Sequence, residues 1–529
     1  MSEERFDHIV IGGGSGGCAV AGRLSEAGRR VCLLEAGGRA DGTMFQVPAG
    51  AAAMLPRKLN NWGFRTEPQP GLNGRAGYQP RGRALGGSSS INAMLYVRGH
   101  RRDYDEWASD GCTGWGWDDV LPFFKRAEDN TRGASDLHGA GGPLSVSDQV
   151  APSPVSHAFV EAGRETQYPV TDDFNGERQE GFGLYQVTQR NGERWSAARA
   201  YIHPHADRAN LDVRTKVRVE RILVENGRAV GVSYRQGGRR RTARCAGDVI
   251  LAAGAFGSPQ LLMLSGIGPA AHLREHGLDV VADRPGVGEN LQDHIDYVLC
   301  YKSDRRDVWG LSAMGAADLW GAWREWKKHR TGRLTTPFAE GGAFVKSDAA
   351  LERPDLQLHF VVGLVDDHMR KLHAGHGWSC HVCVLRPYSR GRVTLRSSDV
   401  FADPSIDMGF LSDERDLDLL EEGYRRTRQV CEAPALAPWR GRELYTDGAE
   451  SRDELRDILR SRADTVYHPV GTCRMGGDGE AVVDPQLRVR GLDNLRIADA
   501  SIMPRIVGGN TNAPTIMIGE KCADMLLAV

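Results

Sequence analysis

A histidine close to the C-terminus is the first residue whose type suits catalysis. His468 stands in the segment TVYHPVGTCRMG, residues 465–476, directly before Pro469. An imidazole has a pKa near neutrality, so it can take up or release a proton under physiological conditions. Proline restricts its own backbone and that of the preceding residue, so we expect Pro469 to hold the loop that carries His468. His468 is therefore a candidate acid–base residue.

A second set of residues, near the N-terminus, suits the binding of a dinucleotide. A short apolar strand over residues 6–11 runs into a GxGxxG motif formed by Gly12, Gly14 and Gly17, and a helix-like segment follows. Gly12 allows the tight turn, Gly14 lets the backbone approach a pyrophosphate, and Gly17 lets the helix pack close to the strand. A second strand, RVCLLEAG, ends at Glu35, whose carboxylate can accept hydrogen bonds from ribose hydroxyls. This element predicts a dinucleotide site without distinguishing NAD from FAD.

Two glycine- and serine-rich segments carry a family resemblance. GRALGGSSSINAMLYVRG (82–99) and GAFGSPQLLMLSGIG (254–268) resemble the two signature segments of the glucose-methanol-choline (GMC) flavoprotein oxidoreductases, and the resemblance covers essentially the whole chain. It implies FAD as the cofactor. It also implies an α/β fold, in which a Rossmann-like FAD-binding domain is interleaved with an α+β substrate domain built on an antiparallel sheet.

Further segments resemble those that contact FAD in this family. TKVRVERI supplies Val217 for the adenine, LRIADASIMP supplies Asp499 for the sugar-phosphate region, and NNWGFRTEP places Trp62 near the flavin. Relatives with a histidyl-flavin bond carry a histidine just before the asparagine of the first signature. Ile91 stands there in this chain, so FAD is predicted to bind non-covalently. The predicted cofactor-binding residues are Gly12, Gly14, Ser15, Gly17, Glu35, Ala36, Trp62, Gly87, Ser88, Asn92, Met94, Val217, Ala253, Asp499, Ala500 and Pro514.

The resemblance also implies which proton His468 would remove. In this family a histidine from an HPxGTCRMG-like segment and an asparagine from a GGNTNAP-like segment face the reactive edge of the flavin, and here they are His468 and Asn512. Oxidation of an alcohol removes the hydroxyl proton as a hydride leaves the carbon for flavin N5. We therefore predict His468 as the general base and Asn512 as the residue that orients the oxygen. Cys473, in the same segment, is interpreted as a packing residue.

The predicted activity is the oxidation of a primary alcohol to an aldehyde, with electrons passed to a quinone or another acceptor, oxygen included. FAEGGAF, DLQLHFV and GHGWSCHVCVLRPYSRG look most like the bacterial branch that acts on aliphatic alcohols. Choline oxidation is the runner-up, because Glu340 or tryptophans could surround a cation. Aryl-alcohol and polyol oxidation stay open. So does a different class, a flavin-containing hydroxynitrile lyase or fatty-acid photodecarboxylase, because a fold does not determine a function.

The residues of the site are far apart in the sequence, so each domain must be assembled from separate segments. Three stretches with β-strand character, RPDLQLHFVV, WSCHVCVLRPYS and GRVTLRS, are predicted to form an antiparallel sheet that roofs the substrate pocket. AVGVSYRQGGRRRTARCAGDVI is predicted to be a hairpin that turns at Gly237-Gly238. The predicted domains are 1–155, 205–305 and 465–529 for FAD binding, and 156–204 and 306–464 for substrate binding.

Two further clusters raise other functions. HAGHGWSCHVC (373–383) brings histidines and cysteines together, but strand alternation separates Cys380 from the neighbours of His381 and the spacing matches no zinc pattern, so no metal is predicted. LWGAWREWKKHR (319–330) carries three tryptophans and a basic cluster, predicted to line one broad helical face. We favour a lid packed over the substrate pocket, with a helix lying in a membrane interface as the alternative.

Composition restricts the partners and the location. The 529 residues include Lys+Arg 67 and Asp+Glu 69, a net charge of −2, so no overall field attracts nucleic acid, and small molecules are the expected partners. The length favours two lobes. The scattered cysteines, a charged start that runs directly into a strand, and no long apolar run indicate a cytoplasmic protein. Peripheral association with the inner face of the membrane is an open alternative.

Overall fold

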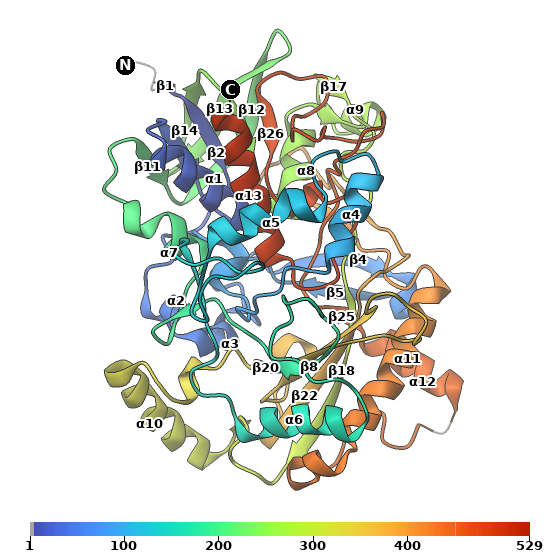
Figure 1. Cartoon of the computed structure of the whole chain (residues 1–529). Helices are drawn as coiled ribbons and strands as arrows, with labels where there is room; N and C mark the ends of the chain where they lie inside the picture. Colours follow the sequence, from blue (N-terminus) through green and yellow to red (C-terminus); the bar gives the residue numbers. More distant parts are fainter. Residues whose placement is uncertain (1–4, 450, 529) are drawn as a thin grey trace.

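The computed structural model describes residues 5–449 and 451–528. Figure 1 shows two regions: α1, α13 and β2 lie in the upper one, and β20, β22 and α6 lie in the lower one. Blue, green and red segments meet in the upper region, which is therefore built from parts of the chain that are far apart in the sequence.

A five-stranded parallel sheet forms the centre of the upper region, as the predicted Rossmann-like fold requires. Its order is β11-β3-β2-β15-β26. Four of its strands are completely buried, which is usual for a parallel sheet covered on both faces. The strand predicted over residues 6–11 is divided, because Arg5–Phe6 (β1) pairs with β14 of another sheet. The bounds are β2 His8–Ile11, β3 Val31–Leu34, β11 Leu211–Arg214, β15 Val249–Leu251 and β26 Leu495–Ile497.

Two helices with small residues at their contact lie against this sheet. They are α1 (Ser15–Glu26) and α13 (Asn512–Leu527). A Cβ on Gly519 would lie 2.5 Å from the carbonyl oxygen of Gly16, so only glycine allows this separation between the helices. The close contact brings their N-termini together, and the Ser15 hydroxyl donates to Asn512 Oδ1 at 2.7 Å.

A four-stranded sheet extends the nucleotide-binding region, in the order β1-β14-β13-β12. The predicted hairpin is confirmed: β13 (Arg228–Gln236) and β14 (Arg239–Cys245) are antiparallel and are joined by Gly237-Gly238. Both glycines have positive φ, 57° and 78°, as a tight two-residue hairpin turn requires. The third long strand, β12 (Val217–Glu225), begins at Val217 and so brings this residue to the edge of the nucleotide site.

The lower region is built on a seven-stranded sheet, in which every pair of neighbouring strands is antiparallel. Its order is β25-β18-β22-β21-β20-β8, and β19 pairs with β22. The bounds are β8 Gly181–Leu184, β18 Ile295–Ser303, β19 Gly310–Leu311, β20 Ala339–Val345, β21 Leu356–Val361, β22 Gly375–Val384 and β25 Asp464–Thr465.

Alternation along these strands separates a packing face from a cavity face. In β21, Leu356 and Leu358 join an apolar core with residues of α6 (Pro154–Glu165) and α11 (Glu414–Cys431). Their neighbours His359 and Val361 line the cavity on the other face. In β22 likewise, Cys380 packs in the core, whereas His381 lines the cavity.

The structure corrects two of the predictions. The segment GRVTLRS forms β23 (Arg392–Thr394), but β23 pairs with β24 (Ser405–Asp407) in a separate two-stranded sheet and does not roof the pocket. The stretch 205–305, predicted for FAD binding, ends with β18, which pairs with β22 in the seven-stranded sheet. This pairing of β18 with the lower region could not be read from local composition.

Candidate active site

The turn between β2 and α1 has the geometry of a phosphate cradle. Gly12 has φ 99°, and a Cβ there would lie 2.4 Å from the carbonyl oxygen of Ala252. A Cβ on Gly17 would lie 2.0 Å from the carbonyl oxygen of Gly12, so the helix packs against the turn as predicted. Gly14 precedes α1, and no side chain caps this helix. The backbone N–H groups of its first turn are therefore available to an anion at the cavity.

Glu35 follows β3 and is bound by the backbone on both sides. Its Oε2 accepts from Gly13 N–H at 2.9 Å and its Oε1 from Gly37 N–H at 2.6 Å. Burial raises the pKa of Glu35 to about 7, against the lowering effect of these two bonds. Glu35 lines the cavity beside Ala36, where it can still accept from a ribose hydroxyl, because each carboxylate oxygen has more than one lone pair.

Asp499 joins the start of α8 (Gly254–Leu264) to the C-terminal part of the chain. Its Oδ2 accepts from Gly254 N–H at 2.8 Å and from the Ser258 hydroxyl at 2.6 Å, while its Oδ1 accepts from Ser501 N–H at 2.8 Å. Burial raises the pKa of Asp499. Asp499 and its neighbour Ala500 line the cavity, so this carboxylate fixes the backbone around the cofactor region.

The first signature segment passes directly over the glycine turn. Gly87 has φ 55°, and a Cβ on it would lie 2.8 Å from Gly14 Cα. Asn92 Oδ1 accepts from Met94 N–H at 3.0 Å and from Arg194 Nη1 at 2.9 Å. Arg194 is buried, which lowers its pKa to about 9. Sequence reasoning missed Arg194, because no motif connects RWSAAR to a signature about a hundred residues earlier.

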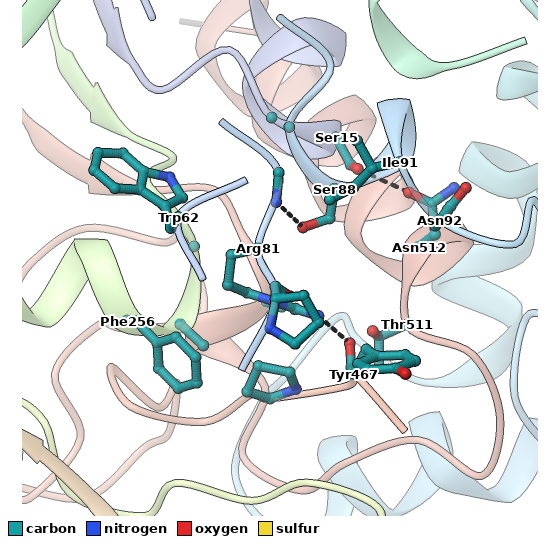
Figure 2. A pocket seen from close by; sticks show the side chains of 18 of the residues that line it. Ser15, Trp62, Arg81, Ser88, Ile91, Asn92, Phe256, Tyr467, Thr511 and Asn512 are labelled. Carbon is teal, nitrogen blue, oxygen red and sulfur yellow. Dashed lines mark hydrogen bonds between the residues drawn. The ribbon is translucent and has the colours of Figure 1, made fainter. Parts of the chain in front are cut away.

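Trp62 marks the far side of the cavity from Asn92 and Asn512 (Figure 2). Its ring stacks on Phe64 at 5.6 Å between centroids, and the guanidinium groups of Arg83 and Arg218 lie over it at 4.6 and 4.8 Å. These contacts hold the indole as one wall of the space predicted for the flavin.

One continuous cavity of about 350 Å³ connects these groups with His468. Its lining includes both predicted catalytic residues and every predicted cofactor residue except Gly17 and Pro514, which lie behind it. An uncapped helix, a glycine turn that no side chain could replace, and the Glu35 carboxylate converge at one end. This combination fits a dinucleotide whose ring system extends toward His468.

His468 lies where the two regions meet. Its Nδ1 is 3.0 Å from Nδ1 of His294, and its backbone N–H donates to Asp293 at 2.8 Å. The preceding residue, Tyr467, has φ 77°, and its carbonyl accepts from the half-buried Arg81 at 2.6 Å, a bond drawn in Figure 2. Several independent contacts therefore orient the imidazole, and sequence reasoning anticipated none of its partners.

Two asparagines two residues apart have different positions. Asn510 contacts the imidazole: its Nδ2 is 3.1 Å from His468 Nε2. Asn512 is the first residue of α13, and its side chain accepts from Ser15 at the start of α1 (Figure 2). Both line the cavity, but Asn512 lies beside the phosphate cradle.

Burial controls the charge of the imidazoles. It holds the pKa of His468 well below its usual range, and the neighbouring His294, His359 and Arg81 lower it further. The pKa values of His294 and His359 fall to about 3 for the same main reason. This differs from the near-neutral pKa expected for His468. All three rings are neutral at pH 7, so each has one unprotonated ring nitrogen, and His468 can accept a proton there.

Cys473 and the histidine–cysteine segment 373–383 are the other groups noted in the sequence. Cys473 is fully buried, and burial raises its pKa well above the usual value, which suits packing rather than nucleophilic attack. Across residues 5–449 and 451–528, no three His, Cys, Asp or Glu side chains come together in a way that could hold a metal ion. His381 instead pairs with Asp296 at 2.6 Å.

Comparison with known proteins identifies the family. Family models described as GMC oxidoreductase match residues 6–296 and 387–519, so the chain belongs to the GMC oxidoreductases. It is an oxidoreductase that uses FAD. An "Alcohol dehydrogenase [acceptor]" from Pseudomonas putida is 47% identical, with 99% of this chain and 96% of the relative covered.

Other relatives carry different names. An "Oxygen-dependent choline dehydrogenase" from Brucella ovis is 44% identical, with 98% of this chain and 95% of the relative covered. The solved structure of a pyridoxine 4-oxidase from Mesorbium loti superposes with a TM-score of 0.90 at 32% identity, over 99% of this chain and all of that one. The family is thus established, whereas the names of the relatives cover several alcohols.

Proposed function

We propose that this enzyme oxidises an uncharged primary alcohol to the aldehyde, with His468 as the general base. The observation that carries the proposal is the contact between Asn510 and His468 at the junction of the dinucleotide cradle and the cavity face of the seven-stranded sheet. Bound FAD supplies the acceptor for the hydride. The contact with Asn510 supports a change from the sequence-based assignment: Asn510, rather than Asn512, holds the alcohol oxygen.

The residues of the chain define the proton transfer. His468 is neutral, so its Nε2 can take the hydroxyl proton as the carbon–hydrogen bond breaks, and the aldehyde forms without a charged oxygen. Asn510 can donate to the same oxygen and keep it beside Nε2 when one amide hydrogen leaves its 3.5 Å contact with His359 Nε2. The resulting imidazolium faces His294 through Nδ1, and Asp293 binds the backbone N–H of His468.

An uncharged substrate is favoured over choline by the position of Glu340. This carboxylate accepts from Ser153 N–H at 2.6 Å and from the hydroxyls of Ser156 and Thr336, each at 2.7 Å. It is buried and does not line the cavity, whereas its neighbour Ala339 does. The carboxylates in the described lining are Glu35 and Asp499, both at the nucleotide end. The lining near His468 includes Phe338, Val361 and Val466, which suit an apolar chain.

The decisive experiment is anaerobic reduction of the purified holoenzyme. We expect an aliphatic primary alcohol to bleach the oxidised flavin band, and choline to leave it unchanged at the same concentration. Bleaching by benzyl alcohol alone would favour the aryl-alcohol alternative, and bleaching by choline would overturn the uncharged substrate. A flavin that no alcohol reduces would favour the lyase or photodecarboxylase class, which no observation on this chain supports at present. Readmission of oxygen, compared with a soluble quinone, then identifies the electron acceptor.

We propose further that FAD is not covalently attached. Ile91, at the position of the flavin-linked histidine in some relatives, is an apolar side chain that lines the cavity and forms no bond to a flavin ring. Acid precipitation of the holoenzyme should therefore release all flavin into the supernatant. Flavin that stays on the polypeptide after washing would contradict this.

We also propose that α10 (Ala313–His329) is a lid. We propose separately that the enzyme is cytoplasmic. The three tryptophans of this helix differ in burial: Trp326 is buried beside Val47 and Leu334, whereas Trp320 is 64% exposed. Ala322 and Trp326 of this helix belong to an apolar cluster against which Phe338, a residue of the cavity lining, also packs, which supports the lid role. No helix in the described parts of the chain is long and apolar enough to cross a membrane. Flotation with liposomes that is lost in Trp320→Ala would favour the membrane alternative instead.

A further inference from the structure

Behind the pair of Asn510 and His468 lies a chain of hydrogen bonds whose direction is determined at its far end. Tyr185 and Gln357 form this chain, and both are buried, at 1% and 0% exposure. Tyr185 follows β8, and Gln357 lies in β21 on the cavity face. Tyr185 belongs to no segment noted in the sequence, Gln357 lies in the segment DLQLHFV, and neither is among the residues that line the cavity.

The chain begins at a backbone carbonyl, which can only accept. The Tyr185 hydroxyl donates to the carbonyl oxygen of Leu358 at 2.9 Å, which uses its one hydrogen. The contact of 3.0 Å between Tyr185 Oη and Gln357 Nε2 must therefore run from the amide to the hydroxyl. This places the NH₂ group of Gln357 toward Tyr185, and its second hydrogen points to Asn510 Oδ1 at 3.0 Å.

The orientation of Gln357 in turn determines which atoms of Asn510 face His468. Since Asn510 Oδ1 accepts from Gln357, the NH₂ group of Asn510 is turned toward the imidazoles: His468 Nε2 at 3.1 Å and His359 Nε2 at 3.5 Å. Two amide hydrogens meet two ring nitrogens, so each nitrogen must offer a lone pair. A neutral His468 with a free Nε2 carries its proton on Nδ1, which donates to His294 Nδ1 at 3.0 Å.

We infer that Tyr185 and Gln357 are positioning residues, which hold neutral His468 in the tautomer with an unprotonated Nε2 facing the cavity. The inference rests on the proposed function, because it is this lone pair that takes the alcohol proton. If the Gln357 amide turned over, Asn510 would follow and present Oδ1 to His468. The imidazole would then carry its proton on Nε2, toward the substrate, where it cannot act as a base.

The test compares Tyr185→Phe and Gln357→Met with wild type and with a matched control, Tyr297→Phe. Phenylalanine keeps the ring of Tyr185 stacked on His359, at 5.8 Å between centroids, and removes only the oxygen that orients Gln357. Methionine keeps the length of Gln357 without its hydrogens. Tyr297 is buried in the same sheet on the opposite face, and its hydroxyl has no partner in the described chain, so its loss should leave turnover unchanged.

Two readouts are needed, and only one of them is activity. We expect kcat to fall on the order of 10-fold in Tyr185→Phe and 10²-fold in Gln357→Met, with KM changed less than about 3-fold, because the substrate still binds while the base is in the wrong tautomer. Nitrogen-15 chemical shifts of labelled histidine, with His468 identified by its absence in His468→Ala, report which ring nitrogen carries the proton. Wild type should show Nδ1–H, and the variants a shift toward Nε2–H.

The outcomes separate this inference from the proposed function. An Nδ1–H tautomer in wild type that is unchanged in both variants, or wild-type kcat in both, overturns the positioning role even if alcohols are oxidised. A tautomer shift in the variants supports the positioning role even if the alcohol panel fails, in which case the proposed reaction alone is wrong. If Gln357→Met does not fold, Tyr185→Phe alone tests the positioning role, because this substitution removes one oxygen atom and keeps the packed ring.

Discussion

At the nucleotide end of the cavity, Glu35 is bound by the N–H groups of Gly13 and Gly37, all within a single β–α–β unit. At the other end, which we call the alcohol end (the lining around His468 and Asn510), His468 contacts His294 and Asn510, 174 and 42 residues away. One end uses backbone geometry that neighbouring residues can provide. The other uses side chains that only the assembled fold brings together. Binding and catalysis should therefore respond separately to mutation.

The largest separation is expected for His468→Ala. Turnover with the alcohol that reduces wild type should fall by a factor on the order of 10² to 10⁴, because the general base is lost. The flavin absorbance of the purified protein should stay at the wild-type ratio, since His468 lies away from the phosphate cradle. Gly12→Ala is the converse variant. Its Cβ would lie 2.4 Å from the Ala252 carbonyl oxygen, so it should purify without flavin. Normal turnover in His468→Ala would remove the base from the mechanism.

Asn510→Ala and Asn512→Ala test the separation of catalysis from FAD binding with two residues that are only two positions apart in the sequence. Asn510→Ala should lower kcat/KM by a factor on the order of 10 to 10², the effect of one hydrogen bond to an oxygen that develops charge. Asn512→Ala should leave kcat/KM within about 3-fold and weaken FAD binding about 5-fold, since it removes one neutral bond to Ser15. Steady-state kinetics and titration of the apoprotein with FAD measure the two effects. The reverse pattern would restore Asn512 as the orienting residue.

The sequence allowed much of the nucleotide end to be predicted. The glycine turn and the Gly237-Gly238 hairpin depend on local geometry that residue type and spacing report. Asn510 and Asn512 could not be separated in this way, because a motif does not reveal that a helix begins at Asn512 and turns its side chain toward α1. The partner His294 and the tyrosine–glutamine chain were out of reach, since their contacts connect strands distant in sequence.

Burial could not be predicted from the sequence either, and it changes the pKa of an ionisable group at each end of the cavity. Sequence suggested an ordinary imidazole at His468 and an ordinary carboxylate at Glu35. Removal from water lowers the pKa of the first and raises that of the second to about 7. Each group is thereby moved toward its neutral form.

The smallest predicted effect is in the pH dependence of kcat/KM. It sharpens the comparison between the two ends of the cavity. A depressed pKa means that free His468 is already unprotonated at pH 7, so kcat/KM should change less than about 2-fold between pH 7 and 9. It should fall only on acidification below the ordinary histidine value of about 6.5. Asp293, which binds the His468 backbone and whose pKa burial raises to about 7, is the neighbour able to add a second limb. Asp293→Asn should remove such a limb, and one that persists near pH 6.5 in this variant would show that His468 titrates as an ordinary imidazole.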